Sequence, residues 1–162
     1  MPDSPSYVVT GGAHGDGRAI VDCLAHSGHV VVIDVADEPD RRDERVSLIT
    51  GDARDSDVAV KAARTAEGSG VLSGWVNNAA VFSEATLDLV SHSEILDLIT
   101  ANLALAVNGC HTAVNHYLAH SAQGRSSTSC LTRHNARCGV PCHMRRPRPR
   151  SRDSPALSQS TT

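Results

Sequence analysis

Apolar residues gather in four short segments over the first half of the chain, each bounded by polar or glycine-rich stretches. The second segment, around Val31, is apolar at successive positions, so both of its faces are buried, as in a parallel sheet covered by helices. We therefore predict four strands, at residues 7–10, 30–34, 46–50 and 72–77.

The stretches between these segments carry helical spacing. Ile20, Val21 and Leu24 recur on one helical face, and Gly28 follows as a terminator. Asp55 has the side chain of a helix N-cap, for a helix that runs to about residue 66. The other predicted helices are residues 18–27, 87–98 and 101–118. The alternation of strands and helices predicts an α/β fold with a Rossmann-type doubly wound parallel sheet.

This periodicity ends near residue 124. Beyond it the chain is rich in Arg, Pro and Ser, and Pro147, Pro149 and Pro155 stand among few apolar residues. Such a composition predicts disorder. We predict a partial Rossmann domain over residues 1–124, truncated after about four strands, and a disordered tail over residues 125–162.

Charge is divided in the same way. The net charge of −3 combines residues 1–124, with 7 Lys/Arg against 17 Asp/Glu, and residues 125–162, with 8 Arg against the acid Asp153. Such asymmetry indicates either a basic tail or a segment of different origin from the rest of the chain.

Length and composition narrow the class of protein. At 162 residues and 40% hydrophobic content, the chain suffices for one domain. It has no run of 18 apolar residues, and its start lacks the basic and apolar pattern of a secretory signal. The five cysteines, an odd number, argue against a disulfide framework. We expect a cytoplasmic protein without a membrane partner.

A glycine cluster stands between the first predicted strand and helix. Gly11, Gly15 and Gly17 let the backbone turn tightly and approach a pyrophosphate, to which the helix N-terminus presents N–H groups. Asp34 ends the second strand, where a carboxylate binds ribose hydroxyls and repels a 2′-phosphate. An ordinary turn and a solvated strand end are the alternatives. Together these residues favour NAD over NADP, although Asp16 adds a carboxylate that would repel the pyrophosphate.

These motifs together resemble the short-chain dehydrogenase/reductase family. The glycines have its TGxxxGxG spacing, and Gly51-Asp52-Ala53 is similar to the segment whose acid and following amide meet the adenine. Asn77-Asn78-Ala79-Ala80 resembles the family's NNAG. The resemblance implies that Asn77 braces the sheet while Asn78 and Ala79 lie along the cofactor ribose.

The resemblance also implies an NAD(P)-dependent oxidoreductase that acts on a small alcohol or ketone, with strand order 3-2-1-4-5-6-7. Asn102 resembles the asparagine of the catalytic tetrad, which holds a water in a proton relay, whereas an ordinary polar helix residue is the alternative. The family's serine and its Tyr-x-x-x-Lys pair have no counterpart here, because no tyrosine follows Tyr117 and no lysine follows Lys61. We expect an inactive chain whose family homo-oligomer interface is lost.

The genetic code permits one explanation of the tail, a frameshift by one nucleotide lost in the Arg125 codon. In the restored frame, allowed codons read Ile-Val-Asn-Val-Leu-Ser, which is similar to the family's fifth strand and its serine. Codons that straddle His143 and Met144, and then Pro147 and Arg148, permit tyrosine and lysine four positions apart. The wobble bases are free, so this reading is a hypothesis.

The tail also contains features typical of two other kinds of site. Its cysteines and histidines match no paired Cys-x-x-Cys spacing, so we predict no metal site. The arginines of residues 145–150 could grip nucleic-acid phosphates, but out-of-frame GC-rich sequence also yields Arg and Pro, and we expect no nucleic-acid partner. Two alternatives to the oxidoreductase stay open: a non-catalytic dinucleotide-binding remnant and a basic-tailed nucleic-acid-binding protein.

Overall fold

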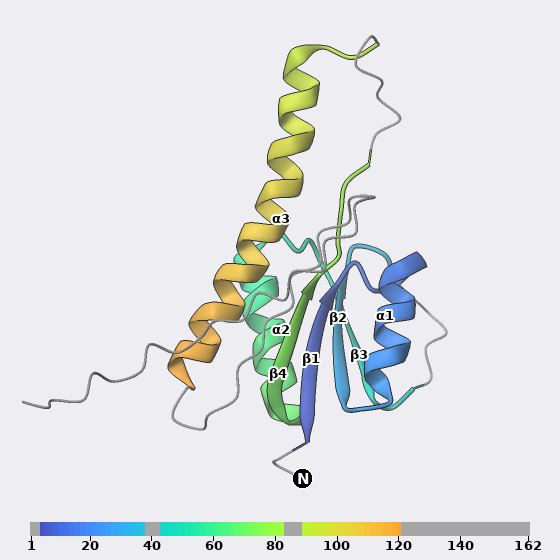
Figure 1. Cartoon of the computed structure of the whole chain (residues 1–162), viewed down its shortest axis with the longest axis vertical. Helices are drawn as coiled ribbons and strands as arrows, with labels where there is room; N and C mark the ends of the chain where they lie inside the picture. Colours follow the sequence, from blue (N-terminus) through green and yellow to red (C-terminus); the bar gives the residue numbers. More distant parts are fainter. Residues whose placement is uncertain (1–3, 38–42, 83–88, 121–162) are drawn as a thin grey trace, which may run out of the picture.

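The computed structural model describes residues 4–37, 43–82 and 89–120 (Figure 1). These residues form a four-stranded parallel sheet in the order β3-β2-β1-β4. The strands are β1 (Pro5–Thr10), β2 (His29–Asp34), β3 (Val46–Thr50) and β4 (Val71–Asn77), and the helices are α1 (Gly15–Ala25), α2 (Ser56–Ser69) and α3 (His92–Ala119). The predicted α/β class and the four strands are confirmed. The tail predicted over residues 125–162 lies outside the described residues.

Helices cover both faces of the sheet, which makes it doubly wound (Figure 1). Successive residues of the central strands point to opposite faces, so Val8 and Val31 join the core beneath α2 and α3. Val9 and Val32 join the second core, beneath α1. All four side chains are at most 1% exposed. The apolar residues of each central strand are therefore buried on both faces of the sheet, as the sequence predicts.

Helix α2 lies close to the sheet because its inward face consists of small side chains. Ala59, Ala62, Ala63 and Ala66 are each at most 3% exposed. The predicted N-cap is confirmed: the Asp55 side chain accepts a hydrogen bond of 2.8 Å from the backbone N–H two residues later.

The two helices predicted over residues 87–98 and 101–118 are one helix, α3, so that prediction was wrong. Nothing between residues 98 and 101 breaks a helix, and the Asn102 side chain bonds to the Leu98 carbonyl within it at 2.9 Å. The predicted start was also wrong. Ser91 and Glu94 form a capping box, in which each side chain accepts a hydrogen bond from the other residue's backbone N–H, and this box sets the start at His92. Residues 87 and 88 lie outside the described part.

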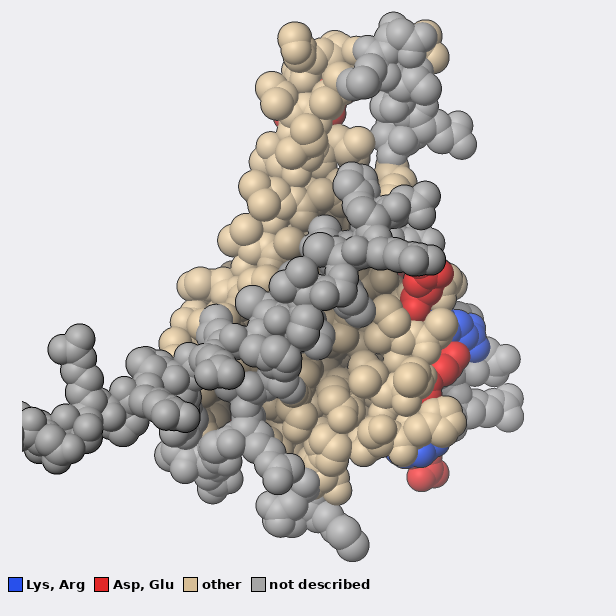
Figure 2. Space-filling view, viewed as in Figure 1, with Lys and Arg blue, Asp and Glu red and all other residues tan. Residues whose placement is uncertain are grey.

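The second half of α3 packs on the sheet, whereas the first half extends beyond it (Figure 1). Leu96, Ile99 and Leu103, in the extended half, are 57–60% exposed. The face of α3 in view is almost free of charge (Figure 2). Among the described residues, no helix is both long enough and apolar enough to span a membrane.

At Gly109, α3 lies directly against side chains of β4. A Cβ atom on this glycine would lie 1.9 Å from Asn77 Oδ1 and 2.8 Å from Trp75 Nε1. The same two side chains are hydrogen-bonded to each other in the core, with the Trp75 Nε1–H donating to Asn77 Oδ1 at 3.0 Å. Asn77 Nδ2 in turn bonds Cys110 Sγ at 3.2 Å. Asn77 thus fastens β4 to α3.

We expect Gly109→Ala to destabilise the fold, although alanine is the better helix former by about 1 kcal/mol. The added methyl group would push α3 away from Asn77 and Trp75, and overpacking of this kind costs about 1–3 kcal/mol. The free energy of unfolding from urea denaturation measures the effect. Gly68→Ala in α2 is the matched control, because its Cβ meets no atom within 4 Å, and it should stabilise. Equal stabilisation by both changes would contradict the close approach.

Candidate functional site

The glycine loop between β1 and α1 has a backbone that requires glycine at two positions. Gly11 has φ +66° and Gly15 has φ +55°, both in the left-handed region. A Cβ at Gly11 would lie 2.7 Å from the Ala79 Cα, so the loop also rests directly on the backbone that follows β4. A Cβ at Gly15 would meet nothing within 4 Å, which leaves open space in front of the N-terminus of α1.

Gly17 lets the first turn of α1 approach the loop. A Cβ there would lie 1.9 Å from the Gly11 carbonyl oxygen and 2.5 Å from Asn78 Nδ2. The same Asn78 Nδ2 donates a hydrogen bond of 2.8 Å to the Gly11 oxygen. The lack of a side chain at Gly17 therefore permits the close approach, and the Asn78 hydrogen bond fixes the loop in this position.

Thr10 joins the ends of β1 and β4, a role that the sequence analysis missed. Its Oγ1 accepts hydrogen bonds from the backbone N–H groups of Asn78, at 3.1 Å, and Ala79, at 3.0 Å. The side chain is 3% exposed. The available signal was the position of this threonine directly before the first glycine of the loop.

Asp34 ends β2 beneath the glycine loop. Its Oδ2 accepts a hydrogen bond of 2.9 Å from the Ala13 N–H, and its Oδ1 accepts one of 3.1 Å from the Ala36 N–H. These two bonds keep the half-buried carboxylate at the carboxyl edge of the sheet, next to the start of α1.

Asp52 follows β3 and forms an ion pair with Arg54, whose Nε donates to Asp52 Oδ2 at 2.9 Å. The hydrogen bonds from Arg54 lower the pKa of the Asp52 carboxyl below its usual value. Ala53, between them, is 6% exposed, and its carbonyl accepts a hydrogen bond of 2.8 Å from Asn108 Nδ2 on α3. Arg54 and Asn108 were also missed by the sequence analysis.

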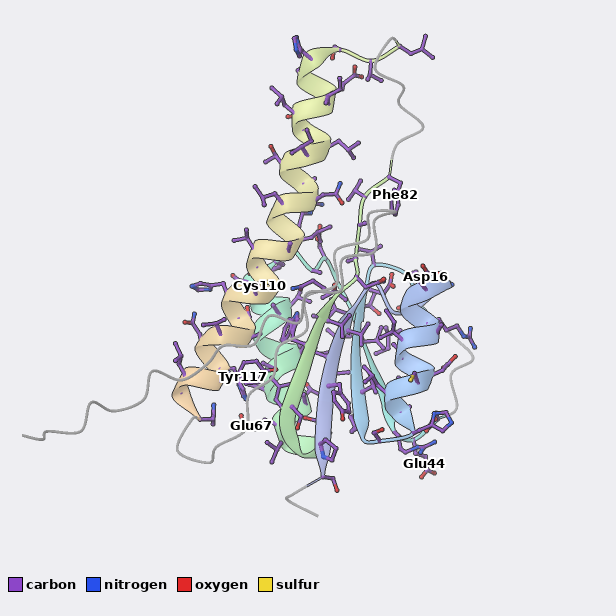
Figure 3. All side chains as sticks on the ribbon, in the orientation of Figure 1. Asp16, Glu44, Glu67, Phe82, Cys110 and Tyr117 are labelled. Atoms are coloured by element: carbon purple, nitrogen blue, oxygen red, sulfur yellow. The ribbon has the colours of Figure 1, made fainter. Side chains whose placement is uncertain are left out.

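The eight residues predicted to contact a cofactor all line one cleft of about 510 Å³ at the carboxyl edge of the sheet. They come from the carboxyl ends of the four strands and the segments that follow them, and are Gly11, Gly15, Gly17, Asp34, Asp52, Ala53, Asn78 and Ala79. The charged residues of the lining are three carboxylates, including Asp16 in the first turn of α1, and the guanidinium of Arg54. Figure 3 shows Asp16 at the loop end of α1 and Phe82 on the segment that leaves β4 above the sheet.

Asn102 does not itself line the cleft, but it holds a residue that does. Its Oδ1 accepts a hydrogen bond of 3.0 Å from the Val81 N–H, and its Nδ2 donates to the Val81 carbonyl at 2.9 Å. The amide group therefore pairs with the backbone of the segment after β4, as a neighbouring strand would. Val81 lies in the cleft wall.

We expect Asn102→Ala to release this segment from α3. A hydrogen bond contributes about 1 kcal/mol net, so the amide proton of Val81 should exchange with solvent about fivefold faster or more. Hydrogen exchange followed by NMR measures this rate. Asn115→Ala is the matched control, since Asn115 lies on the same helix and bonds His111 at 3.1 Å. An unchanged rate at Val81 in Asn102→Ala would show that this pair does not hold the segment.

Comparison with known proteins gives one matching family. The model of the short chain dehydrogenase family matches residues 6–127. A search of curated proteins found no match.

Solved structures of the same description share the fold. A short chain dehydrogenase from Mycobacterium avium has a TM-score of 0.64 and 22% identity, over 80% of this chain and 52% of that one. A short-chain dehydrogenase/reductase described as glucose/ribitol dehydrogenase, from Brucella melitensis, has a TM-score of 0.59 and 24% identity, over 71% and 53%. One from Serratia marcescens has a TM-score of 0.57 and 27% identity, over 70% and 53%. The chain spans about half the length of these proteins.

Proposed function

The chain belongs to the short-chain dehydrogenase family, and on this basis we propose that its cleft binds NAD as the cofactor of an oxidoreductase. The observation that carries the proposal is that eight residues at or after the carboxyl ends of the four strands line one cleft. In open α/β sheets, ligands bind beyond the carboxyl ends of the strands where the strand order reverses. Here that point lies between β1 and β4, because α1 and α3 leave these strands toward opposite faces.

The cleft has the features that a dinucleotide needs. The open space at Gly15 lies at the N-terminus of α1, where backbone N–H groups and the helix dipole favour the pyrophosphate. Asp34 and Asp52 stand at the ends of the next two strands, where the family pattern puts ribose and adenine. Asn78 and Ala79 stand on the other side of the loop, toward the nicotinamide ribose. When bound, the nicotinamide ring accepts or donates the hydride.

Charge favours NAD over NADP. A 2′-phosphate on the adenosine ribose would meet the carboxylate of Asp34, which two backbone N–H groups hold in place. The guanidinium of Arg54 lies in the cleft lining and could bind a phosphate, but it is already hydrogen-bonded to the Asp52 carboxylate. Binding of a 2′-phosphate would therefore require the breaking of an existing ion pair.

Proton transfer is the part of the reaction for which this chain lacks most of the family's residues. The family's serine, tyrosine and lysine have no counterpart in the sequence. We propose that the loss of one nucleotide at codon 125 shifted the reading frame, so that residues 125–162 stand where these three residues would be. The chain is then a dinucleotide-binding remnant. The substrate of the intact protein would be a small alcohol or ketone, and we propose neither a nucleic-acid partner nor an intact family oligomer for this chain.

The activity test compares this chain with the product of a gene to which one base has been restored at codon 125. General acid/base help contributes about 10²–10⁴-fold, so the restored protein should form NADH from secondary alcohols at least about a hundredfold faster. Absorbance of NADH measures both rates. A Tyr→Phe change in the restored Tyr-x-x-x-Lys motif should return the rate to that of the present chain. Comparable turnover by the present chain would overturn the proposed loss of catalysis.

The binding test titrates the present chain with NADH and NADPH and follows nicotinamide fluorescence. NADH should bind more tightly than NADPH. Asp16→Asn should raise NADH affinity about fivefold, because the removed repulsion is about 1 kcal/mol for charges near contact in water. Asp22→Asn is the control on the same helix, outside the cleft lining. Equal affinities for the two dinucleotides would refute the NAD preference, and no binding of either would refute the proposed function of this chain.

A further inference from the structure

Three side chains converge where α2 and α3 end side by side, at the opposite edge of the sheet from the cleft. They are Glu67 near the end of α2 and the pair His116 and His120 at the end of α3. One ligand atom from each lies within 4.8 Å of the other two. Figure 3 labels Glu67 at this end of α2, close to Tyr117 in the last turns of α3. The proposed cofactor site uses none of these residues.

Helix geometry brings the two imidazoles together. His116 and His120 are four residues apart, so they share one face of α3. Their rings are stacked, with centroids 4.2 Å apart and an interplanar angle of 24°. Two histidines spaced in this way, with a carboxylate from a second helix, form a donor set typical of zinc sites.

The hydrogen bonds of His120 orient it as ligating histidines are oriented. Its Nδ1 lies 2.8 Å from the His116 carbonyl oxygen, which can only accept, so Nδ1 carries the proton. Its Nε2 then faces Glu67 Oε1 at 2.7 Å. A ligating histidine usually donates its other ring N–H to a carbonyl or carboxylate in this manner. Nε2 is therefore the ring atom that faces the carboxylate, and a metal ion placed between the two would be bound by both.

Two of the three side chains lie at the surface of the protein. The side chains of His120 and Glu67 are 52% and 43% exposed, so both can rotate by the small amount that coordination requires.

We propose that Glu67, His116 and His120 bind a divalent transition-metal ion of the zinc class, which joins the end of α2 to the last turn of α3. Bonds of about 2.0–2.2 Å place tetrahedral ligand atoms about 3.3–3.6 Å apart, so the Glu67–His120 contact opens by less than about 1 Å. Imidazole nitrogen favours zinc-class ions over magnesium or calcium. A water completes the fourth position, and three protein ligands with one water are a known zinc arrangement.

The test must separate this site from the thiols of the tail. The background is the full chain with three substitutions, Cys130→Ser, Cys138→Ser and Cys142→Ser. Titration with ZnCl2 in a calorimeter should give one ion per chain. His120→Ala and Glu67→Gln should each weaken zinc binding at least about tenfold, since even the loss of an outer partner of a ligand costs about 10–100-fold.

His111→Ala is the matched control, because His111 lies on α3 outside the cluster. It should leave zinc affinity unchanged within about twofold. Zinc should also raise the urea midpoint of the background chain and not that of the Glu67→Gln variant. Because Glu67→Gln keeps the size of the side chain, it tests the site even if His120→Ala does not fold. Absence of one-to-one binding in the background would overturn the proposal. So would equal losses in His111→Ala and His120→Ala, or zinc binding that disappears with the tail cysteines alone.

Discussion

The ends of β1 and β4 meet at backbone contact distance, and the geometry of the cleft depends on that contact. Gly11 comes so near to Ala79 that a Cβ would overlap it, and a positive φ at Gly11 turns the chain away at once. Thr10 accepts two N–H groups from the opposite chain, and Asn78 returns a hydrogen bond to the loop. The N–H groups of Asn78 and Ala79 and the carbonyl of Gly11 therefore each gain a partner at this junction. The result is a loop held open toward the N-terminus of α1.

Helix α3 connects the end of β4 to the segments that follow β3 and β4. Gly109 lets it approach β4, and three asparagine contacts then tie it to the site. Asn77 bonds Cys110, Asn108 bonds the carbonyl of Ala53, and Asn102 pairs with Val81. A helix that was displaced from β4 would thus disturb the β3 loop and the segment after β4 together. This coupling explains why a glycine and amides stand on this face of α3 beside the buried Leu105.

The charges around the cleft fit the proposed dinucleotide site only in part. Helix α1 offers a positive dipole end, while Asp34 and the Asp52–Arg54 pair leave little room for a further phosphate. Asp16, in the first turn of α1, would repel the pyrophosphate of the proposed cofactor. The remote cluster of Glu67, His116 and His120 is independent of this balance, because it lies at the other edge of the sheet.

Local pattern alone determined the strands, their parallel arrangement, the glycine loop and the Asp55 cap, because burial on both strand faces, positive φ and capping are properties of neighbouring residues. The eight cleft residues also came from sequence motifs, although only the folded sheet brings them together. Tertiary structure decided the rest. The continuity of α3 through residues 98–101 is a local property, since no helix breaker stands there, but the roles of Thr10, Arg54 and Asn108 are contacts that a motif does not encode. Glu67 and His120 are 53 positions apart in the chain, so no spacing rule links them. They meet only because α2 and α3 pack on the same face of the sheet.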